Sequence, residues 1–226
     1  MIKCNFPNFS ELSGTYKQSK GILKNHIISD TETYIKLLEN NDTMSLYDKI
    51  VRSDEVYKAL YSKFKFYIDK DSKNIDKYNV ISKTVYNVCE NNYDIGIHLD
   101  RRYHILSQLH YVHNDGINGK LGLYSSEEPE DKIYDMFPKT EDVKLVTEVD
   151  PNPNRVINFL NVPYAYHAAE KFTGNERSFI YTCFDIRFHS GNNLLEQNKG
   201  CHSSDVWNYN TSVKSEDRRQ KFLKND

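Results

Sequence analysis

The pattern of apolar and polar positions changes near residue 80. Before that point, apolar residues recur at helical spacing behind a Ser-Asp-Thr cap at 29–31 and a Ser-Asp-Glu cap at 53–55. The Asn-Asn-Asp run at 40–42 and the Asp-Lys-Asp run at 69–71 indicate breaks between such segments. We therefore expect the first third of the chain to be helical.

From about residue 80 onward, short runs of alternating apolar and polar residues recur between turn residues. This period of two is typical of strands, and many short strands with such spacing predict a sandwich, a barrel or a jelly roll. The predicted strands are 81–89, 105–112, 120–124, 143–149, 155–160, 164–170 and 177–186. Because a few helices can buttress one face of a rolled sheet, we expect a single unit that is mainly β with supporting helices.

Composition narrows the classes of partner. The 226 residues carry 30 Lys and Arg against 32 Asp and Glu, a net charge of −2, which argues against a nucleic-acid binder that relies on phosphate charge. No apolar stretch reaches the length of a membrane span, and the N-terminus lacks the apolar core of a signal peptide. We therefore expect a soluble, cytoplasmic protein with no membrane partner. The cysteines, which show no zinc-type spacing and are expected to be free thiols, are Cys4, Cys89, Cys183 and Cys201.

The segment 125–142 is rich in acidic residues and has a weak strand pattern. Its length favours a lid or a substrate loop. A solvated excursion without a role is the equal alternative.

A His-x-Asp triplet is the first candidate for metal chemistry. On a strand, residues at i and i+2 point to the same face, so His98 and Asp100 could bind one ion. A second triplet, His113-Asn114-Asp115, lies in a turn, where Asp115 is more typical of a turn former. We therefore favour His98 and Asp100 as ligands.

A third ligand and a cation follow later in the chain. His167 lies in the predicted strand 164–170, and Arg177 opens the strand 177–186, where alternation places Arg177 on one face with Phe179 and Tyr181. An arginine on such an apolar face requires an anionic partner if it is buried, and its planar fork suits a carboxylate. The remaining histidines, assigned to surface or core positions, include His104, His110, His189 and His202.

In this order and setting, His98-x-Asp100, His167 and Arg177 resemble the iron(II)- and 2-oxoglutarate-dependent oxygenase superfamily, and most of all its prolyl-hydroxylase-like branch. The segments 104–112, 119–123 and 155–159 resemble strands of that branch, so the match covers about residues 80–187. The resemblance implies a double-stranded β-helix, or jelly roll, at 80–187, while the first third and the last forty residues match no family. We expect one domain, 1–226, in which N-terminal helices at 1–79 support the core by packing on one sheet and 188–226 form a C-terminal extension.

The resemblance also implies the chemistry. His98, Asp100 and His167 would hold Fe(II), a facial triad that leaves three positions open for 2-oxoglutarate and O₂. Arg177 would bind the distal carboxylate of 2-oxoglutarate, with Tyr111 and Tyr86 as further contacts. The implied reaction is hydroxylation of an unactivated C–H bond with release of succinate and CO₂.

The primary substrate is left open between a peptidyl side chain and a small metabolite. Two other readings also stay open: a non-catalytic binding protein, and a cupin-type metal-binding β-barrel protein that does not use 2-oxoglutarate. The position of Arg177 distinguishes these hypotheses, because only the oxygenase needs Arg177 inside the barrel within reach of the cosubstrate.

Overall fold

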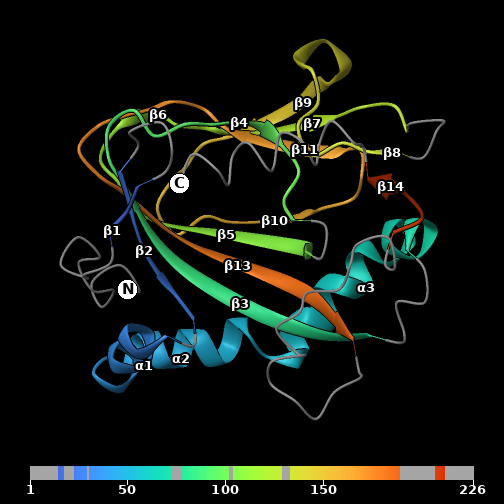
Figure 1. The fold of residues 1–226 in the computed structure, drawn as a ribbon. Coiled ribbons are helices and arrows are strands. Elements are labelled where there is room, and N and C mark those ends of the chain that lie inside the picture. Colours follow the sequence, from blue (N-terminus) through green and yellow to red (C-terminus); the bar gives the residue numbers. More distant parts are fainter. Residues whose placement is uncertain are drawn as a thin grey trace.

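The computed structural model describes residues 15–17, 23–29, 31–72, 78–101, 104–128, 133–188 and 207–211. Two facing antiparallel sheets make up most of it (Figure 1). The larger sheet has the strand order β1-β2-β3-β13-β5-β10. Its strands are β1 (Thr15–Lys17), β2 (Leu23–Ile28), β3 (Tyr78–Cys89), β13 (Arg177–Phe188), β5 (His104–Asn114) and β10 (Val156–Leu160).

The smaller sheet has the order β4-β11-β7-β9 and faces one side of the larger sheet. Its strands are β4 (Ile95–His98), β11 (Ala165–Ala169), β7 (Leu121–Ser125) and β9 (Lys144–Val149). Two short pairs complete the described strands: β6 (Ile117–Asn118) with β12 (Phe172–Thr173), and β8 (Ile133–Tyr134) with β14 (Asn210–Thr211).

Three α-helices are described in the first third of the chain: α1 (Glu32–Glu39), α2 (Asp42–Val51) and α3 (Asp54–Asp71). Each begins behind a side chain that accepts a hydrogen bond from a backbone N–H of the first turn, namely Thr31, Asn41 and Ser53. Asn41 belongs to the run that we interpreted as a break. It separates α1 from α2 by capping α2, a helix that the periodicity did not predict.

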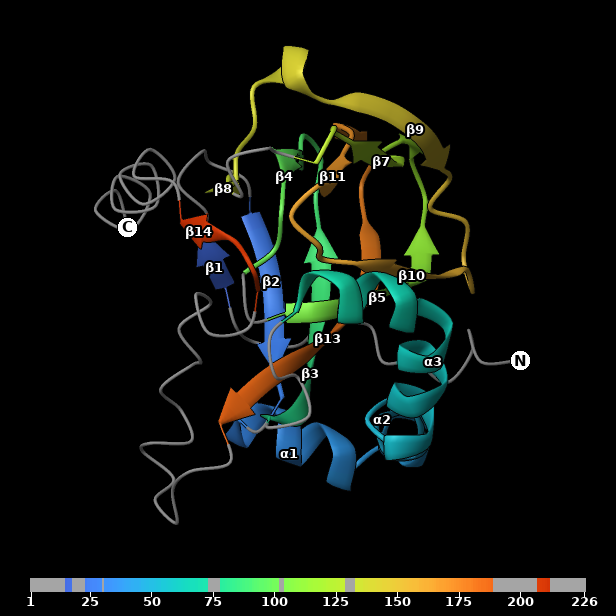
Figure 2. The ribbon, with the colours of Figure 1, turned by 90° about the vertical axis from the view of Figure 1, so that its right-hand side faces the viewer.

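The helices pack against the face of the larger sheet that is turned away from the smaller sheet (Figures 1 and 2). Tyr34 and Met44 of α1 and α2 share a buried cluster with Tyr86 and Ile180. Ile68 of α3 packs in a second cluster that extends to Phe184 and Trp207, with other α3 side chains at its edge. The helices therefore close the outer face of the larger sheet, and its inner face is left to face the smaller sheet.

The predicted fold class, mainly β with supporting helices, is confirmed, and the facing antiparallel sheets are consistent with a jelly roll. All seven predicted strands are present with ends shifted by a few residues. The prediction that residues 1–79 are helical was wrong in part, because β1 and β2 extend the larger sheet next to β3.

No helix among the described residues is long and apolar enough to cross a membrane. Cys89 and Cys183 are buried and belong to no disulfide, whereas Cys4 and Cys201 lie outside the described residues. Of the predicted C-terminal extension, only 188 and 207–211 are described.

Candidate metal centre

The two candidate histidines lie on neighbouring strands of the smaller sheet. His98 ends β4 and is the direct cross-strand partner of His167 in the middle of β11. Their rings lie with centroids 4.2 Å apart. Residues directly opposite in an antiparallel pair have their side chains on the same face, so the sheet register brings the two imidazoles together.

Asp100 completes the group just beyond the end of β4. Its Oδ1 lies 3.9 Å from Nε2 of His98 and 3.7 Å from Nε2 of His167. The backbone N–H of Asp100 donates to the side chain of Asn161, which is fully buried and also donates to the carbonyls of Arg101 and His104. Asn161 thus fixes the segment that carries Asp100.

Electrostatics favour the protonation states that a metal needs. Burial lowers the pKa of the His167 imidazole to about 3, and the neighbouring His98 acts in the same direction. Burial alone would raise the pKa of Asp100, but the three nearby histidines, His167 first, and the hydrogen bond from Tyr181 hold it well below its usual value. A neutral imidazole and a carboxylate are the forms that bind a divalent cation.

The ligand atoms of His98, Asp100 and His167 all lie within 4.8 Å of one another. Two imidazole nitrogens and one carboxylate oxygen are the donor set of a facial triad with open positions, which suits ferrous iron. The residues present therefore fit this metal.

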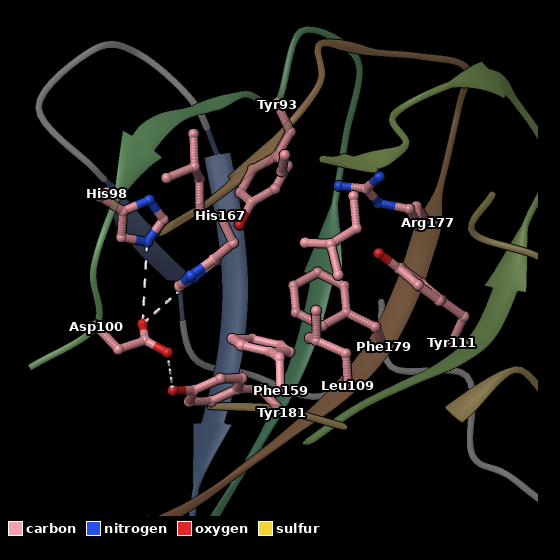
Figure 3. Close-up of a pocket in the computed structure, with 13 residues that line it drawn as sticks. Tyr93, His98, Asp100, Leu109, Tyr111, Phe159, His167, Arg177, Phe179 and Tyr181 are labelled. Atoms are coloured by element: carbon pink, nitrogen blue, oxygen red, sulfur yellow. Dashed lines mark hydrogen bonds and ion pairs between the residues drawn. The ribbon is translucent and has the colours of Figure 1, made fainter. Parts of the chain in front are cut away.

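A cavity of about 140 Å³ adjoins the three residues. Figure 3 shows His98, Asp100 and His167 at one side of it and Arg177 with Tyr111 at the other. Apolar and aromatic side chains separate the two ends, among them Leu109, Phe159 and Phe179. The cavity is therefore an apolar passage with metal-type ligands at one end and a cation at the other.

Arg177 is almost completely buried, with 2% of its surface exposed. Its Nη1 donates to the carbonyl of Gly119 at 2.5 Å, while Nε has no hydrogen-bond acceptor among the described residues. The guanidinium lies near the rings of Tyr93, Tyr111, Phe172 and Phe179, at 5.2 to 6.0 Å from their centroids. These rings stabilise the cation but cannot neutralise it.

Gly119 makes this position of Arg177 possible. Its φ of 75° lies in the left-handed region, and a Cβ at this position would overlap Nη1 of Arg177. The glycine therefore lets the carbonyl approach the guanidinium.

Two tyrosines were predicted as cosubstrate contacts, and the structure places them on opposite faces of the larger sheet. Tyr111 lines the cavity beside Arg177. Tyr86 does not line it: on β3 Tyr86 is opposite Ile180, whereas the cavity residue Phe179 is opposite Asn87. Tyr86 therefore faces the helices, where it stacks on Tyr34, and its prediction as a cosubstrate contact was wrong.

Part of the acidic segment 125–142 runs beside the metal centre. The backbone N–H of Leu99 donates to the carbonyl of Met136 at 2.9 Å. Residues 129–132 of this segment lie outside the described residues, so its role as a lid or substrate loop stays a prediction.

Tyr93, Tyr181 and Asn161 are among the residues that sequence reasoning did not assign to the site. Tyr93 lies over Arg177 and follows the turn after β3, and Tyr181 donates to Asp100 from the strand face predicted for Arg177. Tyr181 could have been found from the sequence, because alternation places it on the same strand face as Arg177. Tyr93 and Asn161 carried no signal, because their roles depend on loop conformation.

No family model and no curated protein matches the chain. Among solved structures, the Fe(II)/α-ketoglutarate-dependent dioxygenase TqaL has a TM-score of 0.52 and 8% identity, covering 84% of this chain and 75% of that one. An oxidoreductase of the 2OG-Fe(II) oxygenase family from Burkholderia pseudomallei has a TM-score of 0.48 and 11% identity over 78% and 75%. A prolyl 4-hydroxylase from Phytophthora capsici has a TM-score of 0.45 and 15% identity, covering 71% of this chain and 47% of that one. The chain is thus similar in structure to 2OG-Fe(II) oxygenases at low identity, and this likeness concerns the fold.

Proposed function

We propose that the two facing sheets form the double-stranded β-helix of an Fe(II)- and 2-oxoglutarate-dependent dioxygenase. The primary substrate would be a peptidyl side chain or a small metabolite, hydroxylated at an unactivated C–H bond. The observation that carries the proposal is one cavity with a His98, Asp100 and His167 group at one end and buried Arg177 at the other. Iron, 2-oxoglutarate and O₂ together supply the oxidation, which yields succinate and CO₂ with the hydroxylated product.

The residues of the chain account for binding of the metal. His167 stays neutral because burial lowers its pKa, so its Nε2 lone pair is available near neutral pH. Nδ1 of His98 lies 2.8 Å from the carbonyl of Gly96, which orients its ring with Nε2 toward Asp100. The two imidazoles and the carboxylate therefore converge without rearrangement of the strands.

Arg177 and its neighbours account for binding of the cosubstrate. A dicarboxylate can place its far carboxylate against the guanidinium of Arg177, which lines the cavity. Tyr111 lies beside the guanidinium, and burial raises the pKa of its phenol, so its hydroxyl stays protonated and can donate to a carboxylate. The walls of the passage between Arg177 and the metal ligands are mostly apolar.

Burial of Arg177 favours this function over a metal-binding protein that does not use 2-oxoglutarate. A charge removed from water is costly unless an anion neutralises it. Arg177 makes no ion pair within the described residues, and its one hydrogen-bond partner is a neutral carbonyl. A site for an anionic cosubstrate explains why the cation is kept there.

The test is anaerobic addition of Fe(II) and 2-oxoglutarate to the purified protein. Binding of the keto acid to the iron is expected to produce a visible metal-to-ligand charge-transfer band, absent with Fe(II) or 2-oxoglutarate alone. Screening peptides, amino acids and other metabolites for stimulated succinate release would then identify the substrate class. A folded, fully metal-loaded protein without the band would contradict the proposal.

A further inference from the structure

The two carboxylate oxygens of Asp100 have different surroundings. Oδ1 faces Nε2 of both His98 and His167. Oδ2 accepts hydrogen bonds from Ser107 Oγ and from Tyr181 Oη, each at 2.8 Å. The dashed lines in Figure 3 show this division for the histidines and Tyr181. One oxygen thus faces the ligand group and the other is occupied by protein donors.

Both donors come from the larger sheet, which lies across from the strand that precedes Asp100. Ser107 on β5 and Tyr181 on β13 have hydroxyl oxygens 3.0 Å apart. Nδ1 of His104 lies 3.2 Å from the Tyr181 hydroxyl. Tyr181 donates its single proton to Asp100. The Tyr181 oxygen can therefore accept a hydrogen bond from a protonated Nδ1 of His104. His104 thus holds Tyr181 in place from behind.

The hydrogen bonds around Oδ2 of Asp100 are shielded from solvent. Ser107 and His104 are buried, and Tyr181 is enclosed in the cavity wall. No water is needed to satisfy Oδ2.

On the basis of the proposed function, we infer that Ser107 and Tyr181 are positioning residues that hold Asp100 as a one-oxygen metal ligand. A carboxylate can bind a metal through one or both oxygens. A second bond from Asp100 would occupy one of the three positions that 2-oxoglutarate and O₂ require. Two hydrogen bonds to Oδ2 oppose that change and keep the third position open.

A second group of potential ligands, His104, Cys183 and Asp185, lies behind Tyr181, with ligand atoms within 4.8 Å of one another. We assign this group to the support of Tyr181 and not to a second metal ion. The ammonium of Lys83 lies 3.7 Å from Asp185 Oδ2, and its positive charge opposes a cation at this place. Nε2 of His104 lies 3.3 Å from Asp185 Oδ1, which orients the ring that contacts Tyr181.

The experiment is anaerobic titration with Co²⁺, without 2-oxoglutarate, followed by the visible absorption of the bound cobalt and by the dissociation constant. Wild type is expected to bind one equivalent. Tyr181→Phe is expected to weaken binding by about tenfold and to change the cobalt spectrum, as loss of hydrogen bonds to a metal ligand does. Ser107→Ala is a smaller change and serves as a second test in case Tyr181→Phe does not fold. It is expected to weaken cobalt binding and to change the spectrum in the same direction.

Tyr47→Phe is the matched control. Tyr47 pairs with His110 on the helix-covered face of the sheet, as Tyr181 pairs with His104 on the inner face. It is expected to leave the cobalt spectrum and affinity unchanged. A cobalt spectrum and affinity unchanged in both Tyr181→Phe and Ser107→Ala would overturn the inference.

Failure of the proposed function gives a different result. His98→Ala and His167→Ala should each abolish cobalt binding. Binding that survives in both variants would show that these residues do not form a metal centre. A second equivalent with a thiolate-to-cobalt band that is lost in Cys183→Ser would overturn the assignment of His104, Cys183 and Asp185 as support.

Discussion

His98 lies directly opposite His167 across the antiparallel pair β4–β11, with the ring centroids 4.2 Å apart. Residues distant in the sequence therefore become neighbours through strand register alone. A one-residue slip of β11 would turn His167 to the other face of the sheet. The candidate metal centre thus depends on the pairing of two short strands, and Asp100 follows where one of them ends.

The first prediction concerns the three ligands. His98→Ala, Asp100→Ala and His167→Ala are each expected to reduce succinate formation from 2-oxoglutarate, measured without substrate as uncoupled turnover, to background. His113→Ala is the control, because His113 belongs to the other His-x-Asp triplet, whose Asp115 accepts hydrogen bonds in a turn. Full activity in a ligand variant, or equal loss in the control, would contradict the assignment.

The second prediction concerns Arg177. Arg177→Ala is expected to raise the apparent 2-oxoglutarate requirement by about 100-fold, since a carboxylate loses its charged, hydrogen-bonded partner in a buried site. The measurement is succinate release over a range of 2-oxoglutarate concentrations. Arg155→Ala, which removes a guanidinium bonded to the Asp150 carbonyl outside the cavity, should leave the requirement unchanged. Equal kinetics in the two variants would show that the anchor is misassigned.

The third prediction concerns Gly119. Gly119→Ala is expected to destabilise the protein by about 1–3 kcal/mol and to weaken 2-oxoglutarate binding, because φ is positive and the new Cβ displaces the guanidinium of Arg177. Gly96→Ala is the matched change, since a Cβ there meets no atom within 4 Å. Urea denaturation and a binding titration would measure both effects. Similar values for the two variants would count against this role of Gly119.

The fourth prediction concerns pH. Burial lowers the pKa of His110 below its usual value. As the pH falls below about 6.5, the unfolded chain therefore binds a proton that the folded chain does not, and the free energy of unfolding decreases. His110→Gln is expected to reduce this loss between pH 7 and pH 5 in urea denaturation, with a residual loss from His104 and His167, whose pKa values burial also lowers. An unchanged pH dependence in the variant would contradict a buried neutral His110.

The sequence was most informative where local pattern and final position coincide. Alternation predicted the strands that carry His167 and Arg177, and it placed Tyr181 on the face of Arg177. Each of these predictions needs only the period of two, which a strand keeps whatever it pairs with.

Predictions that required knowledge of a partner strand were less successful. Tyr86 and Tyr111 were both plausible contacts by type, and only the register of β3 against β13 shows that Tyr86 faces α1. The strands β1 and β2 were missed, since their place in the sheet comes from pairing with β3 and not from a local period. Helix α2 was missed because an asparagine can end one helix and cap the next.

The buried guanidinium of Arg177 also links the fold to its ligand. Without an anion, the folded chain holds an unneutralised cation among four aromatic rings. We therefore expect the ligand-free protein to have a lower free energy of unfolding than a chain without this buried charge. Arg177→Met should therefore raise the melting temperature of the free protein while removing the increase that 2-oxoglutarate or another small dicarboxylate produces in wild type. If 2-oxoglutarate is the cosubstrate, as we propose, the protein would be most resistant to heat when that metabolite is abundant, and its lifetime in a cell would follow the supply.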